Sequence, residues 1–346
     1  MPHWPLALTY ANACGAFAVS RHGCTPAYPS WEELQFFLNR GVVTKALRKD
    51  AALEQIHWST NRRKQWASVR AFAFDHRSQL EDVAGATPEK IGRFKELCLD
   101  ATVAVAQGQD GFGLLCDNRL GKTALHKAAG QGLWIGRPVE WPASRPLTLE
   151  PELGPDFGGL SEWPLAHVVK VLCFYHPDDS DAMKAEQEAT VTRLFHAARR
   201  NRLEFLLEVI PSKVGACDDE TVAKIIERFY EIGVYPDWWK LEPMKTTASW
   251  ANACNAIERN DPYTRGIVVL GLDAPQAELE ESFQLAAGFD LVKGFAVGRT
   301  IFADAARGWL AGQMTDDEAV TMMADRYSRL CQIWDEARAK KKGLAA

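Results

Sequence analysis

A lysine in the segment YPDWWKLEP, residues 235–243, is the clearest candidate for chemistry in this sequence. Lys240 follows two tryptophans and precedes Glu242 and a proline, a pattern typical of the end of a short buried strand. Burial among indole rings would disfavour the ammonium and lower the pKa of the lysine, as an imine-forming nucleophile requires. The alternative is a structural role, in which Lys240 pairs with Glu242 or another buried carboxylate.

Two further charged residues lie inside apolar runs, Lys170 in HVVKVLCFY and Glu208 in LEFLLEVI. Such side chains must face an interior or be paired, because burying a lone charge is costly. With Lys240 they would make two amines and one carboxylate. A neighbouring ammonium lowers the pKa of a nucleophilic lysine, and a carboxylate can shuttle the protons of carbinolamine formation and dehydration. A structural ion network is the alternative.

The segment VKGFAVGRT, residues 292–300, predicts a phosphate site. It ends in Gly298 and Arg299, where a helix is expected to begin, and free backbone N–H groups beside a guanidinium can hold a phosphate. Gly271, at the end of the preceding apolar run, would let a phosphate approach the backbone there too.

Eight short apolar runs are expected to be the strands that position these residues. They span residues 71–75, 113–117, 134–139, 167–175, 205–210, 238–242, 266–272 and 291–297. Helical spacing between most of them implies parallel pairing, and eight such units predict a closed (β/α)8 barrel. The short interval between the second and third runs leaves an open doubly wound sheet as the alternative.

The active site of such a barrel lies at the carboxyl ends of its strands, so the polar residues there are candidates as a set. The set comprises Asp75, His76, Arg77, Asp117, Arg119, Arg137, Glu140, Lys170, His176, Asp178, Asp179, Glu208, Lys240, Glu242, Asp273, Gly298 and Arg299. A charged residue at a strand end is commonly a solvated loop residue or a helix cap. Lys170, Glu208 and Lys240 differ because they fall on three consecutive strands and could converge.

The ends of the chain differ from its middle. Residues 1–42 have a small pattern of their own, in which Ser30 can cap a helix and Glu33 follows three residues later. Residues 43–68 are charged and helix-prone and are expected to be a linker with a helix. The barrel is expected over residues 69–340.

Composition limits the classes of function. The chain has 346 residues, 47% apolar and 25% charged, as in soluble globular proteins. A net charge of -5 argues against nucleic-acid or membrane-surface binding, and no apolar run could span a bilayer. There is no signal-peptide pattern at the start, and eight scattered cysteines fit free thiols in a reducing cytosol, so a cytoplasmic protein is expected.

Metal and cofactor motifs are missing from the sequence. The histidines have no HxH or HExxH spacing, and there is no GxSxG, Walker A or GxGxxG motif. No metal or cofactor is therefore expected. His76 and His176 at strand ends leave one alternative, a metal site assembled from distant segments.

Several segments resemble a known family. FAFDHRSQL, RPVEWPASRPL, EWPLAHVVKVLCFYHPDD, LLEVIP, YPDWWKLEP, GIVVLGLDAP and VKGFAVGRTIF together resemble the domain fused behind the kinase in bacterial 5-dehydro-2-deoxygluconokinases of myo-inositol catabolism. The head, ANACGAFAVSRHGC, resembles the closing segment of a ribokinase-type sugar kinase. Its phosphoryl-transfer region has no counterpart here, so the resemblance implies no kinase activity and a fused or associated sugar kinase as partner.

The barrel portion is also similar, more distantly, to class I tagatose-1,6-bisphosphate aldolases. Their DxxKxE strand matches Asp237, Lys240 and Glu242, which implies that Lys240 is the Schiff-base lysine. The resemblance also implies roles for Lys170, Glu208 and Asp75, and a phosphate site at Gly298 and Arg299. The first-strand motif departs from the family, since DHR, which is Asp75, His76 and Arg77, stands where the aldolases have DQR, and RPVEWP has no counterpart.

Together the resemblances imply a homo-oligomeric class I aldolase. It would cleave 6-phospho-5-dehydro-2-deoxy-D-gluconate to dihydroxyacetone phosphate and malonate semialdehyde, with Lys240 attacking the C5 ketone. Arg299 would bind the phosphate and Arg137 the carboxylate, because an arginine fork fits that group. The further expected substrate contacts are His76, Arg77 and Glu242. The alternatives are a non-catalytic sugar-phosphate-binding module that regulates a kinase, and a metal-dependent aldolase.

Overall fold

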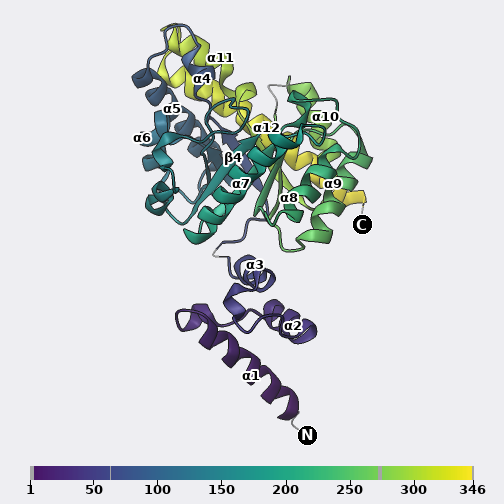
Figure 1. Ribbon diagram of the computed structural model, residues 1–346. Coiled ribbons are helices and arrows are strands. Elements are labelled where there is room, and N and C mark those ends of the chain that lie inside the picture. Colours follow the sequence, from purple (N-terminus) through teal and green to yellow (C-terminus); the bar gives the residue numbers. More distant parts are fainter. Residues whose placement is uncertain (1–3, 63, 272–274, 345–346) are drawn as a thin grey trace. The chain divides into compact units, whose positions relative to one another are not determined.

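The chain divides into two compact units, residues 1–65 and 66–346, each of which is described by itself. The computed structural model in Figure 1 describes residues 4–62, 64–271 and 275–344. Within these ranges every helix is too short or too polar to span a bilayer.

The second unit contains a closed barrel of eight parallel strands. They are β1 (Val69–Ala73), β2 (Phe112–Leu115), β3 (Trp134–Pro138), β4 (His167–Cys173), β5 (Glu204–Val209), β6 (Trp238–Leu241), β7 (Gly266–Leu270) and β8 (Val292–Val297). The predicted (β/α)8 barrel is thus confirmed. The open-sheet alternative is wrong, because β1 pairs with β8 and closes the ring.

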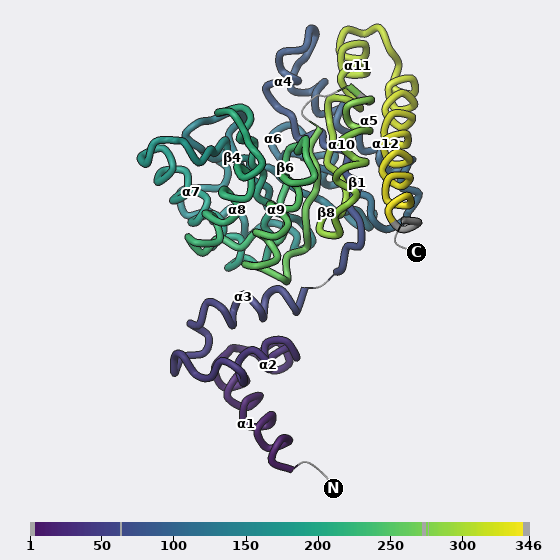
Figure 2. The backbone as a smooth tube through the Cα atoms, turned by 90° about the vertical axis from the view of Figure 1, so that its right-hand side faces the viewer, coloured from purple at the N-terminus to yellow at the C-terminus, as the bar shows by residue number. Residues whose placement is uncertain are grey.

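Helices surround the strands, as Figure 1 shows. They are α4 (Ser78–Glu81), α5 (Pro88–Ala106), α6 (Asn118–Ala128), α7 (Asp181–Arg200), α8 (Thr221–Glu231), α9 (Thr247–Asn260), α10 (Gln276–Ala286), α11 (Arg299–Leu310) and α12 (Asp316–Leu344). The long α12 packs against α5, α10 and α11 (Figure 2). Three short 3-10 helices lie in the loops: η3 (Pro151–Leu153), η4 (Gly158–Glu162) and η5 (Pro211–Lys213).

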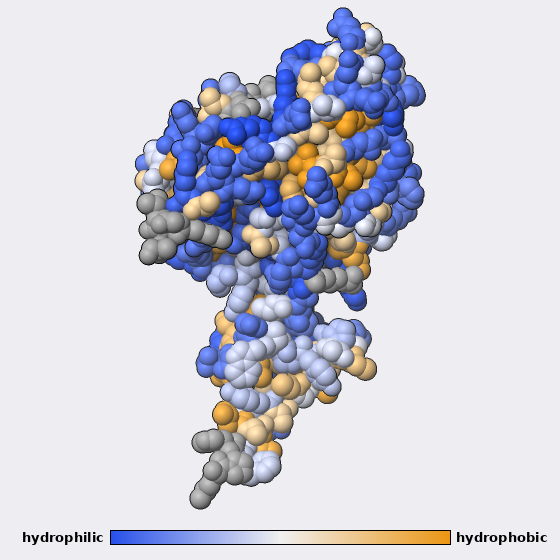
Figure 3. Space-filling view, turned by 180° about the vertical axis from the view of Figure 1, so that it is seen from behind, coloured by the Kyte–Doolittle hydropathy of each residue, from blue (hydrophilic) through white to orange (hydrophobic). Residues whose placement is uncertain are grey.

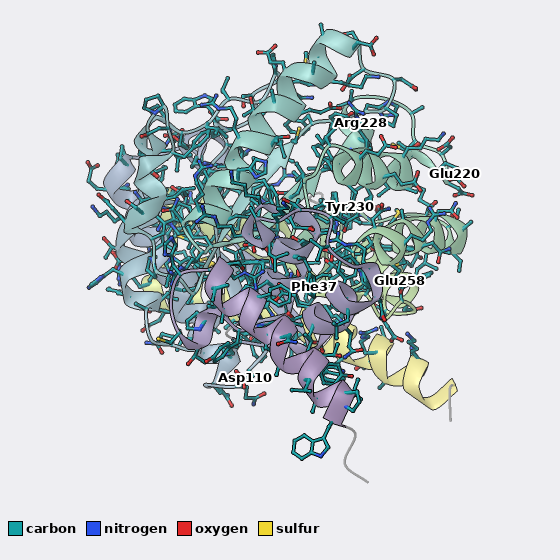
Figure 4. All side chains as sticks on the ribbon, turned by 60° about the horizontal axis from the view of Figure 1, so that its bottom comes forward. Phe37, Asp110, Glu220, Arg228, Tyr230 and Glu258 are labelled. Carbon is teal, nitrogen blue, oxygen red and sulfur yellow. The ribbon has the colours of Figure 1, made fainter. Side chains whose placement is uncertain are left out.

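The outer faces of the strands pack against these helices. Trp239 of β6, for example, donates a hydrogen bond from Nε1 to the hydroxyl of Tyr230 at 3.1 Å. Tyr230 lies on α8 and is labelled in Figure 4 together with Arg228 of the same helix. Arg228 in turn pairs with Glu188 of α7 at 2.8 Å, so neighbouring helices are joined to one another as well as to the barrel.

Alternate residues of each strand fill the inside of the barrel. Trp134 and Trp238 occupy its lower part, with ring centroids 5.6 Å apart in an edge-to-face arrangement. Small residues on β1 and β8, such as Ala71 and Ala296, leave room for these indoles. The indoles thus form an apolar layer beneath the next inward-facing positions toward the carboxyl ends of the strands. Lys170 and Lys240 occupy two of these positions.

The first unit consists of α1 (Trp4–Ser20), η1 (Thr25–Ala27), α2 (Trp31–Arg40), η2 (Leu47–Lys49) and α3 (Ala51–Thr60). The expected cap is present, since the Ser30 hydroxyl accepts a hydrogen bond from Glu33 N at 3.1 Å. The small core contains Phe17 and Phe37, the latter labelled in Figure 4, with ring centroids 5.0 Å apart. Of residues 43–68, expected to form a linker with a helix, the part up to residue 65 belongs to this unit, where η2 and the helix α3 pack.

The first unit also carries many apolar side chains on its surface, as Figure 3 shows. Its exposed large apolar residues are Trp4, Leu6, Leu8, Val19, Tyr28, Trp31, Val42 and Val43.

Candidate active site

The carboxyl ends of the barrel strands enclose a cavity of about 320 Å³. Ten of the residues predicted from the sequence as site candidates line it: Asp75, His76, Arg77, Glu140, Lys170, Glu208, Lys240, Gly271, Gly298 and Arg299. Two others, Arg137 and Glu242, are not among its described lining residues. Asp273 lies outside the described residues.

Glu208 joins the two lysines. Its Oε1 lies 2.7 Å from the Lys240 Nζ, and its Oε2 lies 2.8 Å from the Lys170 Nζ. Glu208 and Lys240 are direct register partners on β5 and β6, which turns both side chains to the inside of the barrel. The Lys240 amine therefore contacts a carboxylate rather than the indoles beside it in the sequence, and its partner is Glu208 rather than Glu242.

Lys170 is surrounded by acidic groups. Besides Glu208, its Nζ lies 2.9 Å from Glu140 Oε1 and 3.3 Å from Asp75 Oδ2. Burial lowers the pKa of this amine, but the carboxylates of Glu140, Glu208 and Asp75 outweigh burial and raise the pKa above its ordinary value. Lys170 is therefore a permanent ammonium at neutral pH, suited to electrostatic work and unsuited to nucleophilic attack.

The buried carboxylates of Asp75 and Glu208 are ionised because they lie next to groups of opposite charge, as Lys170 does. Burial raises the pKa of Asp75 and of Glu208, but the ammonium groups of Lys170 and Lys240 outweigh it and bring both pKa values below the ordinary range. Each carboxylate can thus accept a hydrogen bond or a proton at neutral pH.

Glu140 holds the end of β3 to the cluster. Its Oε2 accepts a hydrogen bond from Leu172 N at 3.1 Å, and its Oε1 accepts one from Arg77 Nη2 at 3.0 Å. Arg77 also donates to Glu150 Oε1 at 3.0 Å. The Arg77 guanidinium, predicted to contact substrate, is therefore committed to two buried carboxylates.

The opposite side of the cavity has the predicted phosphate features. Gly298 precedes α11, whose first residues Arg299 and Thr300 line the cavity together with Gly271. A Cβ at position 298 would lie 2.1 Å from Ala73 O, so only glycine fits this close approach of two strand ends. The helix N-terminus and the Arg299 guanidinium together suit a phosphate group.

Arg137 is directed away from the cavity. Its neighbour Pro138 is the register partner of Lys170, so Pro138 faces inward and Arg137, one residue earlier, faces outward. The guanidinium carbon lies 3.7 Å from the ring centroid of Trp163. Arg137 is therefore not among the described lining residues of the cavity, and its position gives no support to the predicted contact with a substrate carboxylate.

Glu242 and His176 hold a loop instead of facing the cavity. Glu242 Oε1 accepts a hydrogen bond from Ser212 N at 3.0 Å, and the Ser212 hydroxyl donates to Glu242 Oε2. His176 Nδ1 accepts from Asp178 N at 3.2 Å, which leaves its Nε2–H to donate to Ala216 O at 3.0 Å. Both residues fix the segment that follows β5.

Asp117 of the strand-end set and Asp237 of the DxxKxE match have structural roles. Asp117 caps α6 through Leu120 N at 2.7 Å and pairs with the buried Lys95. Asp237, at the opposite end of the barrel, accepts a hydrogen bond from Phe205 N at 2.9 Å. Across the described ranges, no group of three or more His, Cys, Asp or Glu side chains is placed to hold a metal ion.

A test of pH dependence follows from two histidines, of which His76 is partly buried and His167 is buried. Burial lowers the pKa of His76 to about 4, with Asp75 opposing and Arg299 and Lys240 adding to the effect. Burial and Arg137 lower the pKa of His167 to about 4. Since an unfolded histidine has a pKa near 6.5, the unfolded state binds more protons between about pH 6.5 and 4, and acidification in that window should destabilise the fold.

The expected difference is measurable by urea unfolding at a series of pH values. His76→Gln should lose less stability than wild type between pH 6.5 and 4, by about 3 kcal/mol at most. His126→Gln, which changes an exposed histidine, is the control. Parallel pH curves for wild type and His76→Gln would contradict the assignment of a neutral His76.

The closed barrel of eight parallel strands is similar in fold to an aldolase of known structure. Fructose-bisphosphate aldolase from Plasmodium falciparum, crystallised with TRAP and a small-molecule inhibitor, is similar over 83% of this chain and 95% of that chain, with a TM-score of 0.58 and 14% identity. The Corynebacterium glutamicum protein Cgl0159 is similar over 87% of this chain and 97% of that chain, with a TM-score of 0.48 and 14% identity.

The sequence identifies the family more closely. The chain belongs to the family described as uncharacterized protein conserved in bacteria (DUF2090), whose model matches residues 33–338. The search of curated proteins found no match.

Proposed function

We propose that this protein is a class I aldolase in which Lys240 forms an iminium with a keto sugar phosphate. The observation that carries the proposal is the contact of Glu208 with both lysines, at 2.7 Å and 2.8 Å, on the floor of the cavity. A buried amine next to a carboxylate that can take its proton is the arrangement that imine chemistry needs. The similarity of the fold to an aldolase supports it as an analogy.

The proposed substrate is 6-phospho-5-dehydro-2-deoxy-D-gluconate. The Lys240 amine adds to its C5 ketone, and the carbinolamine loses water to give an iminium. A base takes the C3 hydroxyl proton, the C3–C4 bond breaks, and its electron pair moves toward the iminium nitrogen to leave an enamine. Malonate semialdehyde departs from the C1–C3 half. Protonation of the enamine at C4 and hydrolysis of the iminium release dihydroxyacetone phosphate and return the free amine.

Each neighbouring group has a role in this sequence. Glu208 accepts the proton that the Lys240 ammonium must lose before attack, and returns it when the carbinolamine hydroxyl leaves as water. The Lys170 ammonium lies beside Glu208 and offsets the negative charge that proton transfer leaves in the site. Asp75, fixed by Lys170 at 3.3 Å, is placed to orient substrate hydroxyls.

The substrate phosphate is proposed to lie against Gly271, Gly298 and Arg299. These residues follow β7 and β8, the positions at which barrels commonly bind phosphate. A phosphorylated substrate must be supplied by a phosphoryl-transfer reaction, in keeping with the resemblance of residues 1–42 to a sugar-kinase segment.

Reductive trapping tests the proposal directly. Borohydride added with dihydroxyacetone phosphate should reduce the iminium and leave a three-carbon phosphate adduct on Lys240, located by intact-mass and peptide mass spectrometry. An adduct on Lys170 would instead identify this residue of β4 as the nucleophile. No adduct, despite separately measured binding of dihydroxyacetone phosphate, would contradict the proposal and favour a regulatory binding module or a metal-dependent aldolase.

A further inference from the structure

The cavity has more positive than negative side chains. Among its described lining residues are five cationic side chains, of Arg77, Lys170, Lys213, Lys240 and Arg299, and three carboxylates, of Asp75, Glu140 and Glu208. Arg77, Lys170 and Lys240 each contact at least one carboxylate, and Arg299 lies at the phosphate end. Lys213, which the sequence analysis did not single out, is left without a role.

Lys213 has no partner of its own in the parts of the chain that the structure describes. It is the last residue of η5 and is exposed, yet it lines the cavity. No described side chain or backbone group forms an ion pair or a hydrogen bond with its amine. An ammonium at a cavity wall without a counter-ion is available for an anionic ligand.

The backbone that carries Lys213 is held on both sides. Ser212, the preceding residue, is bound by Glu242 from the end of β6. Ala216, three residues later, is bound by His176 from the loop after β4. Unlike a lysine on a free loop, Lys213 therefore starts from a fixed backbone position, which reduces the backbone entropy lost on binding a ligand.

Lys213 lies at a different part of the mouth from the phosphate features. It follows β5, whereas Arg299 follows β8, with β6 and β7 between these two strands. Lys240 of β6 reaches the cavity between the two positions. The loops after β3, β4 and β5 also line the cavity with apolar groups, those of Pro142, Phe174 and Ile210. An apolar wall strengthens the attraction between an ammonium and an anion.

We propose that Lys213 binds the second anionic group of the substrate, and that the site selects substrates charged at both ends. This inference rests on the proposed function and replaces Arg137 as the ligand of the substrate carboxylate. The class of substrate is a keto sugar phosphate that carries a carboxylate at the end remote from the phosphate. The same residue would bind the carboxylate of the aldehyde product in the reverse, condensing direction.

Two aldehydes of equal carbon number isolate this role. Dihydroxyacetone phosphate is condensed either with malonate semialdehyde, which has a carboxylate, or with propanal, which is uncharged. Lys213→Met should lower kcat/KM for malonate semialdehyde by about 10- to 100-fold, the usual worth of a hydrogen bond to a charged group. It should leave kcat/KM for propanal within about 2-fold of wild type. Lys213→Arg should restore most of the loss.

The matched control is Lys245→Met, which removes an exposed lysine from the loop after β6 that does not line the cavity. This variant should keep the wild-type kcat/KM for both aldehydes. Borohydride trapping with dihydroxyacetone phosphate alone should be the same in wild type and Lys213→Met, because this ketone has no carboxylate. Equal losses for both aldehydes, or reduced trapping in Lys213→Met, would overturn the role of Lys213 while leaving the aldolase proposal intact. A wild-type protein that traps no ketone and forms no product would remove the proposed function and this inference with it.

Discussion

Lys240→Met should abolish aldol cleavage, with a loss in kcat of at least about 10⁴-fold, as expected when an enzyme loses its nucleophile. Methionine keeps the length of the buried side chain but cannot form an iminium. The other cavity residues should still hold the substrate, so binding of dihydroxyacetone phosphate should weaken far less than turnover. The measurements are steady-state cleavage rates, calorimetric binding and the adduct mass after borohydride.

Lys293→Met is the matched control for this result. Lys293 is also a lysine on a barrel strand, but it is only partly buried and lies near the amino end of β8, where its amine donates to Asp290 O at 2.8 Å. Its loss should change the rate by less than about 3-fold, in the range of an ordinary surface substitution. A Lys240→Met variant that keeps full cleavage activity would overturn the assignment of the nucleophile.

Lys170→Met should destabilise the protein by about 3 to 5 kcal/mol at pH 7, because it leaves buried carboxylates without their counter-ion. Glu140, Glu208 and Asp75 all lie within 3.3 Å of the Lys170 Nζ. Urea unfolding of wild type and variant gives the difference directly. Adding Glu140→Gln to the variant removes one of the orphaned charges and should recover part of the loss.

The pH dependence of this loss has a definite sign. The pKa values of Asp75 and Glu208 are lowered in the folded protein, chiefly by Lys170 against the opposing effect of burial. Their stabilising contribution is therefore present above the ordinary carboxyl pKa near 4 and is lost as the pH falls below it. The difference in the free energy of unfolding between wild type and Lys170→Met should become smaller when unfolding is measured below pH 4. A difference in the free energy of unfolding of less than about 1 kcal/mol at pH 7 would contradict the stabilising role proposed for the ion cluster.

The strands and the central lysines could be predicted because both leave a signal in the local sequence. An apolar run marks each strand, and a charge inside such a run, as at Lys170 and Glu208, must face a common interior. Glu140 and Lys213 leave no such signal. Both lie outside the strands, and their positions depend on how loops return to the barrel: the β3 loop through the Glu140–Leu149 bridge and the β5 loop through Ser212 and Glu242.

Arg137 shows a different limit. Its residue type fits a carboxylate, and its place at the end of a strand is as predicted, yet its side chain is on the outer face. Successive strand residues alternate between faces, so an error of one position in the register reverses the direction of a side chain. The pairing of β3 with β4, in which Pro138 is the partner of Lys170, fixes the register here.

The two tryptophans at the base of the barrel close the cavity at its inner end, so that it opens only at the carboxyl ends of the strands. Trp134 and Trp238 are buried and block any passage along the barrel axis beneath Lys240. In the proposed reaction, the keto acid, both products and the water that hydrolyses the last iminium would consequently use the same opening. Malonate semialdehyde would therefore, in that reaction, have to leave through this opening before water could enter by the same route to hydrolyse the iminium.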